Sequence, residues 1–109
     1  MHEKVEKAVN LLIAEFSKRF DDFHGIYLYG LFLDGNFHEE EDIELVAVFD
    51  SEDKAKRELI WPIVGKVETE LDVFIDLNPT TMAELEKDEE LYEDVVKNGL
   101  FFNPLGQSF

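Results

Sequence analysis

Two strand-like segments joined by a turn lie in the first half of this chain of 109 residues. Residues 26–31 are apolar and partly aromatic, and residues 43–49 are continuously apolar after Glu44. Such runs are typical of strands, and the second run is typical of a central strand covered on both faces. The Asp-Gly-Asn sequence at 34–36 has turn chemistry. The centre of the chain therefore predicts a small sheet built on these two strands.

The second strand opens with two acidic residues in alternation, Asp42 and Glu44. Residues i and i+2 of a strand point to the same face. We therefore expect both carboxylates to project together, while Ile43 and Leu45 point into the core. Adjacent carboxylates repel each other unless a cation lies between them. Because Mg²⁺ prefers one or two carboxylates plus phosphate oxygens, the pair predicts a magnesium site.

A third strand is predicted at about residues 71–77, where Asp72, Phe74 and Asp76 share one face. A buried strand seldom places a carboxylate there without a counter-charge or a metal. If this strand lies beside the second, Asp76 completes a set of three carboxylates. Two metal ions held ~4 Å apart by such a set can clamp the attacking and leaving oxygens of a phosphoryl or nucleotidyl transfer. The equally simple alternative is that Asp76 ends its strand before the turn at 78–79.

Helical patterns surround these strands. Apolar residues recur at helical spacing over about residues 2–20, and Ser51 can cap a second helix in which Pro62 predicts a kink or break. Shorter helices are predicted after Thr81 and after Asp88. Residues 100–105 form an apolar tail that either adds an edge strand or meets a partner. At this length we expect one domain over residues 1–109.

Charge and composition narrow the function. The formal net charge is −16, which disfavours direct binding to nucleic acid or to anionic membranes. The chain contains no cysteine, so thiolate catalysis and cysteine metal sites are excluded. No stretch approaches the ~20 apolar residues that span a bilayer. We expect a soluble, cytoplasmic protein.

Several of these residues together carry a resemblance to a known family. Gly30-Leu31, then Gly35, then Asp42-Ile43-Glu44-Leu45, with Asp76 on a later strand, resemble the minimal nucleotidyltransferases of the DNA polymerase beta-like superfamily. Some members are antitoxins paired with HEPN-domain toxins. The resemblance covers nearly the whole chain, including the ending 91–100. It implies an α/β fold with a small mixed β-sheet flanked by helices.

The resemblance also assigns roles to single residues. It implies that Asp42, Glu44 and Asp76 bind Mg²⁺ with a nucleoside triphosphate, that Asp76 acts as the catalytic base, and that Gly30 and Leu31 contact the nucleotide. However, the family follows its first glycine with a serine, whose hydroxyl and N–H hold a phosphate. Leu31 has no hydroxyl, so the glycine-serine motif is degenerate.

Cationic residues are also missing from this region. No Lys or Arg lies between Arg19 and Lys54, whereas a triphosphate carries about four negative charges that need donors. Lys54, Lys56 and Arg57 are the nearest basic residues in sequence, and a solvated helix face explains them more simply. His38 could reach the site as a ligand or proton carrier, but a solvated loop histidine is the simpler interpretation.

Two functions remain open. The first is Mg²⁺-dependent nucleotidyl transfer to a protein or small-molecule hydroxyl, which we expect to be weak or lost. The second is a non-catalytic, antitoxin-like or regulatory binding module with the same fold and a HEPN-type protein partner. In the second case the acidic surface and the apolar tail at 101–105 would form the interface.

Overall fold

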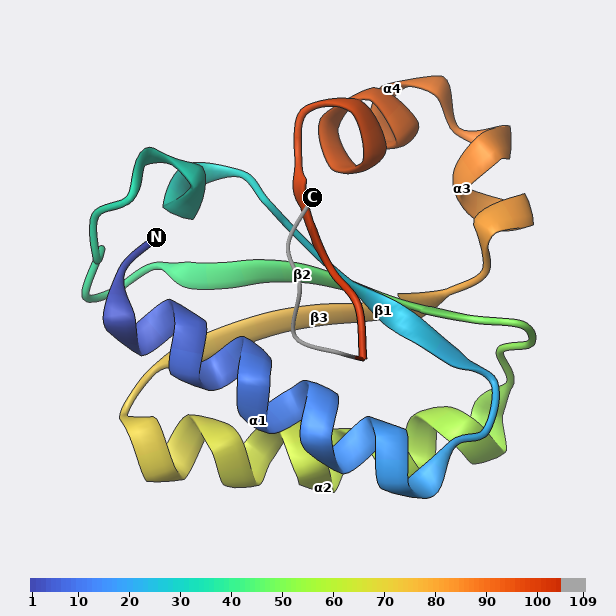
Figure 1. Cartoon of the computed structure of the whole chain (residues 1–109), viewed down its shortest axis with the longest axis horizontal. Coiled ribbons are helices and arrows are strands. Elements are labelled where there is room, and N and C mark those ends of the chain that lie inside the picture. Colours follow the sequence, from blue (N-terminus) through green and yellow to red (C-terminus); the bar gives the residue numbers. More distant parts are fainter. Residues whose placement is uncertain (105–109) are drawn as a thin grey trace.

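The computed structural model describes residues 1–104 and shows a four-stranded mixed sheet between two helical layers (Figure 1). The strand order is β3-β2-β1-β4; β2 and β3 are parallel, and the other neighbours are antiparallel. Here η1 is a short 3₁₀ helix and η2 a π-helical turn. The elements are α1 (Glu3–Arg19), β1 (Phe23–Tyr29), η1 (Leu31–Asp34), β2 (Asp42–Phe49), α2 (Lys54–Leu71), β3 (Phe74–Thr80), α3 (Met82–Lys87), α4 (Glu89–Tyr92), η2 (Glu93–Lys97) and β4 (Leu100–Phe102).

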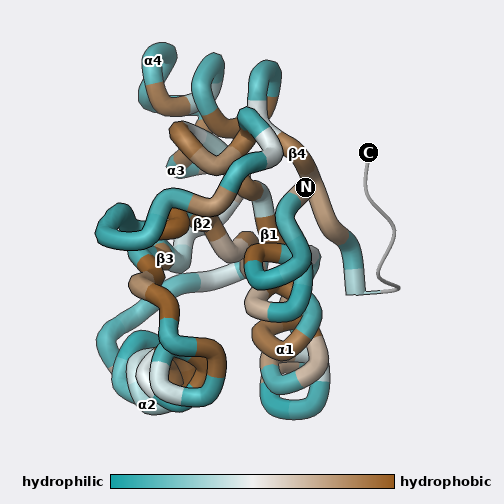
Figure 2. Tube along the Cα trace, turned by 90° about the vertical axis from the view of Figure 1, so that its left-hand side faces the viewer, coloured by the Kyte–Doolittle hydropathy of each residue, from teal (hydrophilic) through white to brown (hydrophobic). Residues whose placement is uncertain are grey.

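The sheet separates two apolar clusters. Helices α1 and α2 lie side by side under one face, and α3, α4 and η2 lie over the other (Figures 1 and 2). Alternation along β2 divides its side chains accordingly: Ile43, Leu45, Ala47 and Phe49 pack in the larger cluster with α1 and α2. Val46 and Val48 pack in the smaller cluster with Leu85 and Val95 of the other layer. The predicted small mixed sheet flanked by helices is therefore confirmed.

The first helix, the second strand and the two late caps are where the sequence predicts them, whereas β1 begins three residues earlier than predicted and ends at Tyr29, before Gly30 and Leu31. Thr81 accepts a hydrogen bond from the Glu84 N–H and Asp88 accepts one from the Leu91 N–H, each closing a helix N-terminus. Asp53, not the predicted Ser51, is the N-cap of the second helix. The predicted break at Pro62 was wrong, because the helix continues through this residue; a kink there stays a prediction. Its apolar side chains on both sides of the proline pack in the same cluster, which holds the helix together.

The third strand begins three residues later than the position predicted from the sequence, because α2 extends to Leu71. Asp72 is the C-cap of this helix, with φ of 54°, and does not share a strand face with Asp76. The strand continues through Asn78 and Pro79 instead of ending before them. Proline is tolerated there because β3 is an edge strand, on which a missing N–H need not interrupt the ladder.

The outer side of β3 is partly blocked by side-chain chemistry. The backbone N–H of Ile75 donates to Oε2 of Glu68, on α2, at 2.9 Å. Pro79, four residues further along, has no N–H to offer. Because of these two residues, the outer edge of β3 presents fewer free backbone N–H donors.

The apolar tail forms β4, which pairs with β1, so the edge-strand alternative is confirmed for residues 100–102. Phe102 is buried in the core, and Phe101 stacks on Tyr27 with ring centroids 4.7 Å apart. These side chains pack within the fold, and a partner interface on this part of the tail stays a prediction. Leu105 lies outside the described residues. No helix in the described part of the chain is long and apolar enough to span a membrane.

Candidate functional site

Three predicted acidic residues lie on one face of the sheet, at the end where β2 begins. Glu44 pairs with Asp76 of β3 on one side and with Tyr29 of β1 on the other. Asp42 pairs with Phe74 in the adjoining register position. Paired residues on neighbouring strands share a face. The structure therefore confirms that the third strand lies beside the second, with Glu44 in the middle of a row across three strands.

A pocket of about 380 Å³ opens above this row. It is lined by Tyr29, Gly30, Leu33, Glu44, Asp94 and Asn98. Asp94 lies within η2 and Asn98 follows it, and π-helical turns are frequent at functional sites. Sequence reasoning did not identify these two residues. The helix was predicted, but its π geometry, which determines the residues that face the pocket, has no short motif.

Negative charge dominates the electrostatics of the pocket. Burial, followed by the negative charges of Asp76, Asp42, Asp94 and Glu41, raises the pKa of Glu44. Burial also raises the pKa of the Tyr29 hydroxyl, and the charges of Glu44, Asp76 and Asp94 add to this effect. Among the described residues, no lysine or arginine lines the pocket.

Gly30, at the end of β1, is held in a conformation that glycine alone adopts easily. Its φ of 80° and ψ of −148° turn the chain from the strand into η1. The Glu44 carboxylate lies directly on this turn: a Cβ built on Gly30 would be 1.9 Å from Glu44 Oε2. The next side chain, Leu31, is 46% exposed and presents no polar atom. The predicted nucleotide-binding turn is therefore covered by a carboxylate.

The arrangement does not form a metal-binding set as it stands. Within residues 1–104, no three His, Cys, Asp or Glu side chains are grouped so that they could hold a metal ion. Asp42, Glu44 and Asp76 share a face, but the Glu44 carboxylate is turned onto Gly30, and neither Asp42 nor Asp76 lines the pocket. In this conformation the three carboxylates are not gathered around one point, and Mg²⁺ binding and the predicted roles of Asp42, Glu44 and Asp76 remain predictions.

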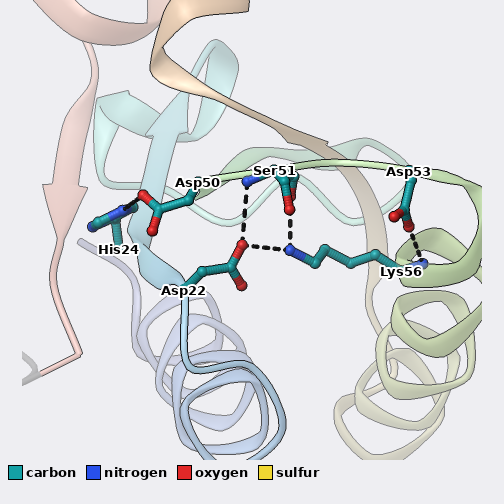
Figure 3. Close-up of polar contacts among 6 residues, drawn as sticks. All are labelled: Asp22, His24, Asp50, Ser51, Asp53 and Lys56. Atoms are coloured by element: carbon teal, nitrogen blue, oxygen red, sulfur yellow. Dashed lines mark hydrogen bonds and ion pairs between the residues drawn. The ribbon is translucent and has the colours of Figure 1, made fainter.

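The basic residues near the start of α2 lie at the other end of the sheet. Lys56 Nζ donates to Asp22 Oδ2 at 2.6 Å and to the Ser51 carbonyl at 2.7 Å (Figure 3). Asp22 precedes β1, whereas the pocket opens where β1 ends. Arg57 pairs with Glu52. The interpretation as a solvated helix face holds for Lys54, but it was wrong for Lys56, whose side chain is only 12% exposed and holds this end of the fold together.

The predicted loop histidine has a local role. His38 Nε2 contacts Asp34 Oδ2 at 2.8 Å, and its ring packs edge-on against Phe32. Asp34 Oδ1 also accepts the Asn36 N–H at 2.8 Å. His38 therefore helps to fix the loop between η1 and β2, and it does not line the pocket.

Neutralising Glu44 is expected to stabilise the fold at neutral pH. The pKa of Glu44 is raised in the folded protein, so its ionised form is less favourable there than in the unfolded chain. This penalty is present in full above the folded-state pKa and vanishes as the pH falls below the unfolded value, about 4.3. We expect Glu44→Gln to exceed the wild-type stability to urea at pH 7.5, with the difference shrinking towards pH 4.

The matched control for this comparison is Glu86→Gln. Glu86 is an exposed carboxylate on α3 and is not among the charges that act on Glu44. Its substitution should leave the pH profile of the unfolding free energy unchanged. A profile of Glu44→Gln that runs parallel to that of the wild type from pH 4 to 7.5 would contradict the assigned electrostatics.

Comparison with known proteins shows which solved structures the fold resembles. No protein-family model matches the chain, and no curated protein matches it. Similar solved chains come from crystal structures of the MntA–HpeT toxin–antitoxin complex. One is from a mutant with two aspartates, two positions apart, changed to glutamate; it has a TM-score of 0.62 and 26% identity over 84% of this chain and 69% of its own. The other, from a tyrosine-to-alanine mutant, has a TM-score of 0.59 and 24% identity over 84% of this chain and 68% of its own. The chain has a nucleotidyltransferase-like α/β fold.

Proposed function

We propose that this chain is an antitoxin-like module that acts by binding a protein partner, with nucleotidyl transfer weak or lost. The observation that carries the proposal is the composition of the pocket at the end of β1, which among residues 1–104 is lined by carboxylates and by no lysine or arginine. A triphosphate with about four negative charges needs cationic or N–H donors. The likeness to chains from a toxin–antitoxin complex supports a protein partner.

The chemistry of the surface beside the pocket supports a partner that is basic and partly apolar. Leu31 and Leu33, both on η1, are 46% and 41% exposed, and Phe74 at the start of β3 is 54% exposed. Four consecutive acidic residues, 39–42, follow at the end of the next loop and the start of β2, and all four are exposed. Exposed apolar side chains among like charges are typical of interaction sites. The HEPN-type partner that the resemblance implies is our specific candidate.

Co-expression with the product of the neighbouring gene tests this function. We expect the two proteins to elute as one complex in size-exclusion chromatography and the chain to relieve any growth inhibition by its neighbour. The double substitution Leu31→Arg, Leu33→Arg should weaken the complex at least tenfold, because it removes apolar contact and adds positive charge. Trp61→Arg is the control, since Trp61 is as exposed but lies on α2, under the opposite face of the sheet. Separate elution with unrelieved inhibition would refute the proposal.

A weak Mg²⁺-dependent nucleotidyl transfer is the second candidate, because Asp42, Glu44 and Asp76 share one face of the sheet. In this case the first two residues would hold the metal, and Asp76 would hold metal and take the proton from an acceptor hydroxyl. The metal would supply charge neutralisation for the triphosphate. Calorimetric titration of ATP or CTP with Mg²⁺ tests it: binding that disappears in Asp42→Asn supports transfer, and no binding at millimolar nucleotide refutes it.

A further inference from the structure

We propose that the Glu44 side chain closes the turn at Gly30 to phosphate, and that the length of this side chain, more than its charge, excludes a nucleotide from the pocket. This inference concerns the site of the proposed function and gives a cause for its weak or lost transfer. It assigns to Glu44 the role of an internal plug in place of the ligand role that the resemblance implies.

The contact between Glu44 and Gly30 carries the inference. Where a Cβ of residue 30 would stand, Glu44 Oε2 is 1.9 Å away and Cδ is 3.0 Å away. The end of the carboxylate therefore occupies the space above the turn, on the pocket side. Both residues line the pocket, so the carboxylate stands between the open part of the pocket and the turn. A phosphate oxygen could reach the turn only by displacing it.

Side-chain length decides whether residue 44 reaches the turn. Glu44 is the first β2 residue paired with β1, and its partner Tyr29 is the residue immediately before Gly30. An aspartate at this position is shorter by one C–C bond, about 1.5 Å. Its carboxylate would stop over the strand, on the side of Asp76. The turn at Gly30 would then be open.

Two substitutions separate length from charge. Glu44→Asp keeps the negative charge and shortens the side chain, whereas Glu44→Gln keeps the length and removes the charge. Glu44→Ala removes both the length and the charge. Glu44→Asp and Glu44→Ala are therefore the two open variants, in which the turn at Gly30 is uncovered. Since Glu44 is only half-buried and no hydrogen bond of its carboxylate holds the fold together in the described residues, we expect all three to fold. Thermal melting checks this before any titration.

The probe is inorganic triphosphate with Mg²⁺, titrated into the full ¹⁵N-labelled chain while the amide signals of Gly30 and Leu31 are followed by NMR. We expect saturable shifts of these two signals in Glu44→Asp and Glu44→Ala, with an apparent affinity at least tenfold above the wild type. The wild type and Glu44→Gln should show no saturation at millimolar triphosphate. Signals on the far side of the sheet, such as Gly65 on α2, serve as the internal control.

Three results would overturn the inference. Saturable binding by the wild type would show that the turn is open. Saturable binding by Glu44→Gln without binding by Glu44→Asp would show that charge, not length, excludes the phosphate. No binding by either open variant would show that another feature, such as Leu31, limits the site. None of these results depends on the partner assay, so a failure here and a failure of the proposed partner function remain distinguishable.

Discussion

Replacing Gly30 with alanine is expected to lower the free energy of unfolding by about 3 kcal/mol, which corresponds to roughly 13 °C in the melting temperature of a domain of this size. Two costs add up. The backbone at Gly30, with φ of 80° and ψ of −148°, lies in a region that other residues occupy at a cost of roughly 1–3 kcal/mol. The new Cβ would also stand 1.9 Å from Glu44 Oε2, so the carboxylate must move away. Urea unfolding followed by circular dichroism measures the sum.

Gly35→Ala is the matched control for this prediction. Gly35 also has a positive φ, 84°, but nothing lies within 4 Å of a Cβ built on it. Gly35→Ala should lower the free energy of unfolding only by the cost of placing alanine in the left-handed conformation, about 1–2 kcal/mol. A double-mutant cycle of Gly30→Ala with Glu44→Ala then isolates the contact, because removing the carboxylate relieves the clash and leaves the backbone cost. If Gly30→Ala and Gly35→Ala cost the same, the Glu44 side chain does not press on the turn.

Replacing Lys56 with methionine is expected to cost about 2–3 kcal/mol. The Lys56 side chain is 12% exposed, and its Nζ bonds to Asp22 and to the Ser51 carbonyl while lying 4.7 Å from the centroid of the Phe49 ring. Methionine keeps the volume but leaves the Asp22 carboxylate, itself only 24% exposed, without its counter-charge. This contact joins the entrance of β1 to the start of α2 (Figure 3). Thermal and urea unfolding measure the loss.

The dependence of stability on acid pH tests whether the loss in Lys56→Met comes from the contact with Asp22. Burial alone raises the pKa of Asp22, but hydrogen bonds from Lys56 and from the Ser51 N–H, with the Lys56 charge, outweigh it, so the pKa lies below its usual value. The stability from this group is present above the unfolded-state pKa, about 3.9, and is lost as the pH falls through the folded-state pKa. In Lys56→Met this part of the acid dependence should be reduced.

Lys54→Met is the control for Lys56→Met. Lys54 pairs with Glu58 on the exposed surface of the same helix, with Nζ 4.0 Å from Oε1, and such pairs contribute less than about 1 kcal/mol. An equal loss in the two variants would mean that the Asp22 contact adds nothing beyond a surface ion pair.

The acidic face could be predicted from sequence because two-residue alternation leaves a strand little choice once its core side chains are known. Ile43 and Leu45 had to be buried, so Asp42 and Glu44 had to share the other face. Glu44 can pair with Asp76 only if β3 lies beside β2. The sequence alone does not predict which strands are neighbours, so this pairing could only be stated as conditional on that arrangement.

Two features of the site could not be predicted, for physical reasons. The position of the Glu44 carboxylate on Gly30 depends on a side-chain rotamer and on a backbone turn that are set by the tertiary fold. Asp94 and Asn98 line the pocket, and both lie in or next to the π turn that ends the last helix. A π turn depends on tertiary packing and has no short sequence motif, so local propensity does not predict it. The end of β3 was misplaced because Pro79 indicated a turn, whereas an edge strand accepts a proline.

The outer margin of β3 has a consequence for how molecules of this protein meet one another. The Ile75 N–H already donates to Glu68, and Pro79 has no N–H. A strand from another molecule that approached this edge would therefore lack two backbone donors with which to pair. Sheet-to-sheet polymerisation along this margin is thereby discouraged, even in a folding intermediate where the strand is newly formed. Recognition on this side is left to side chains, which can select a partner in a way that a bare ladder of amides cannot.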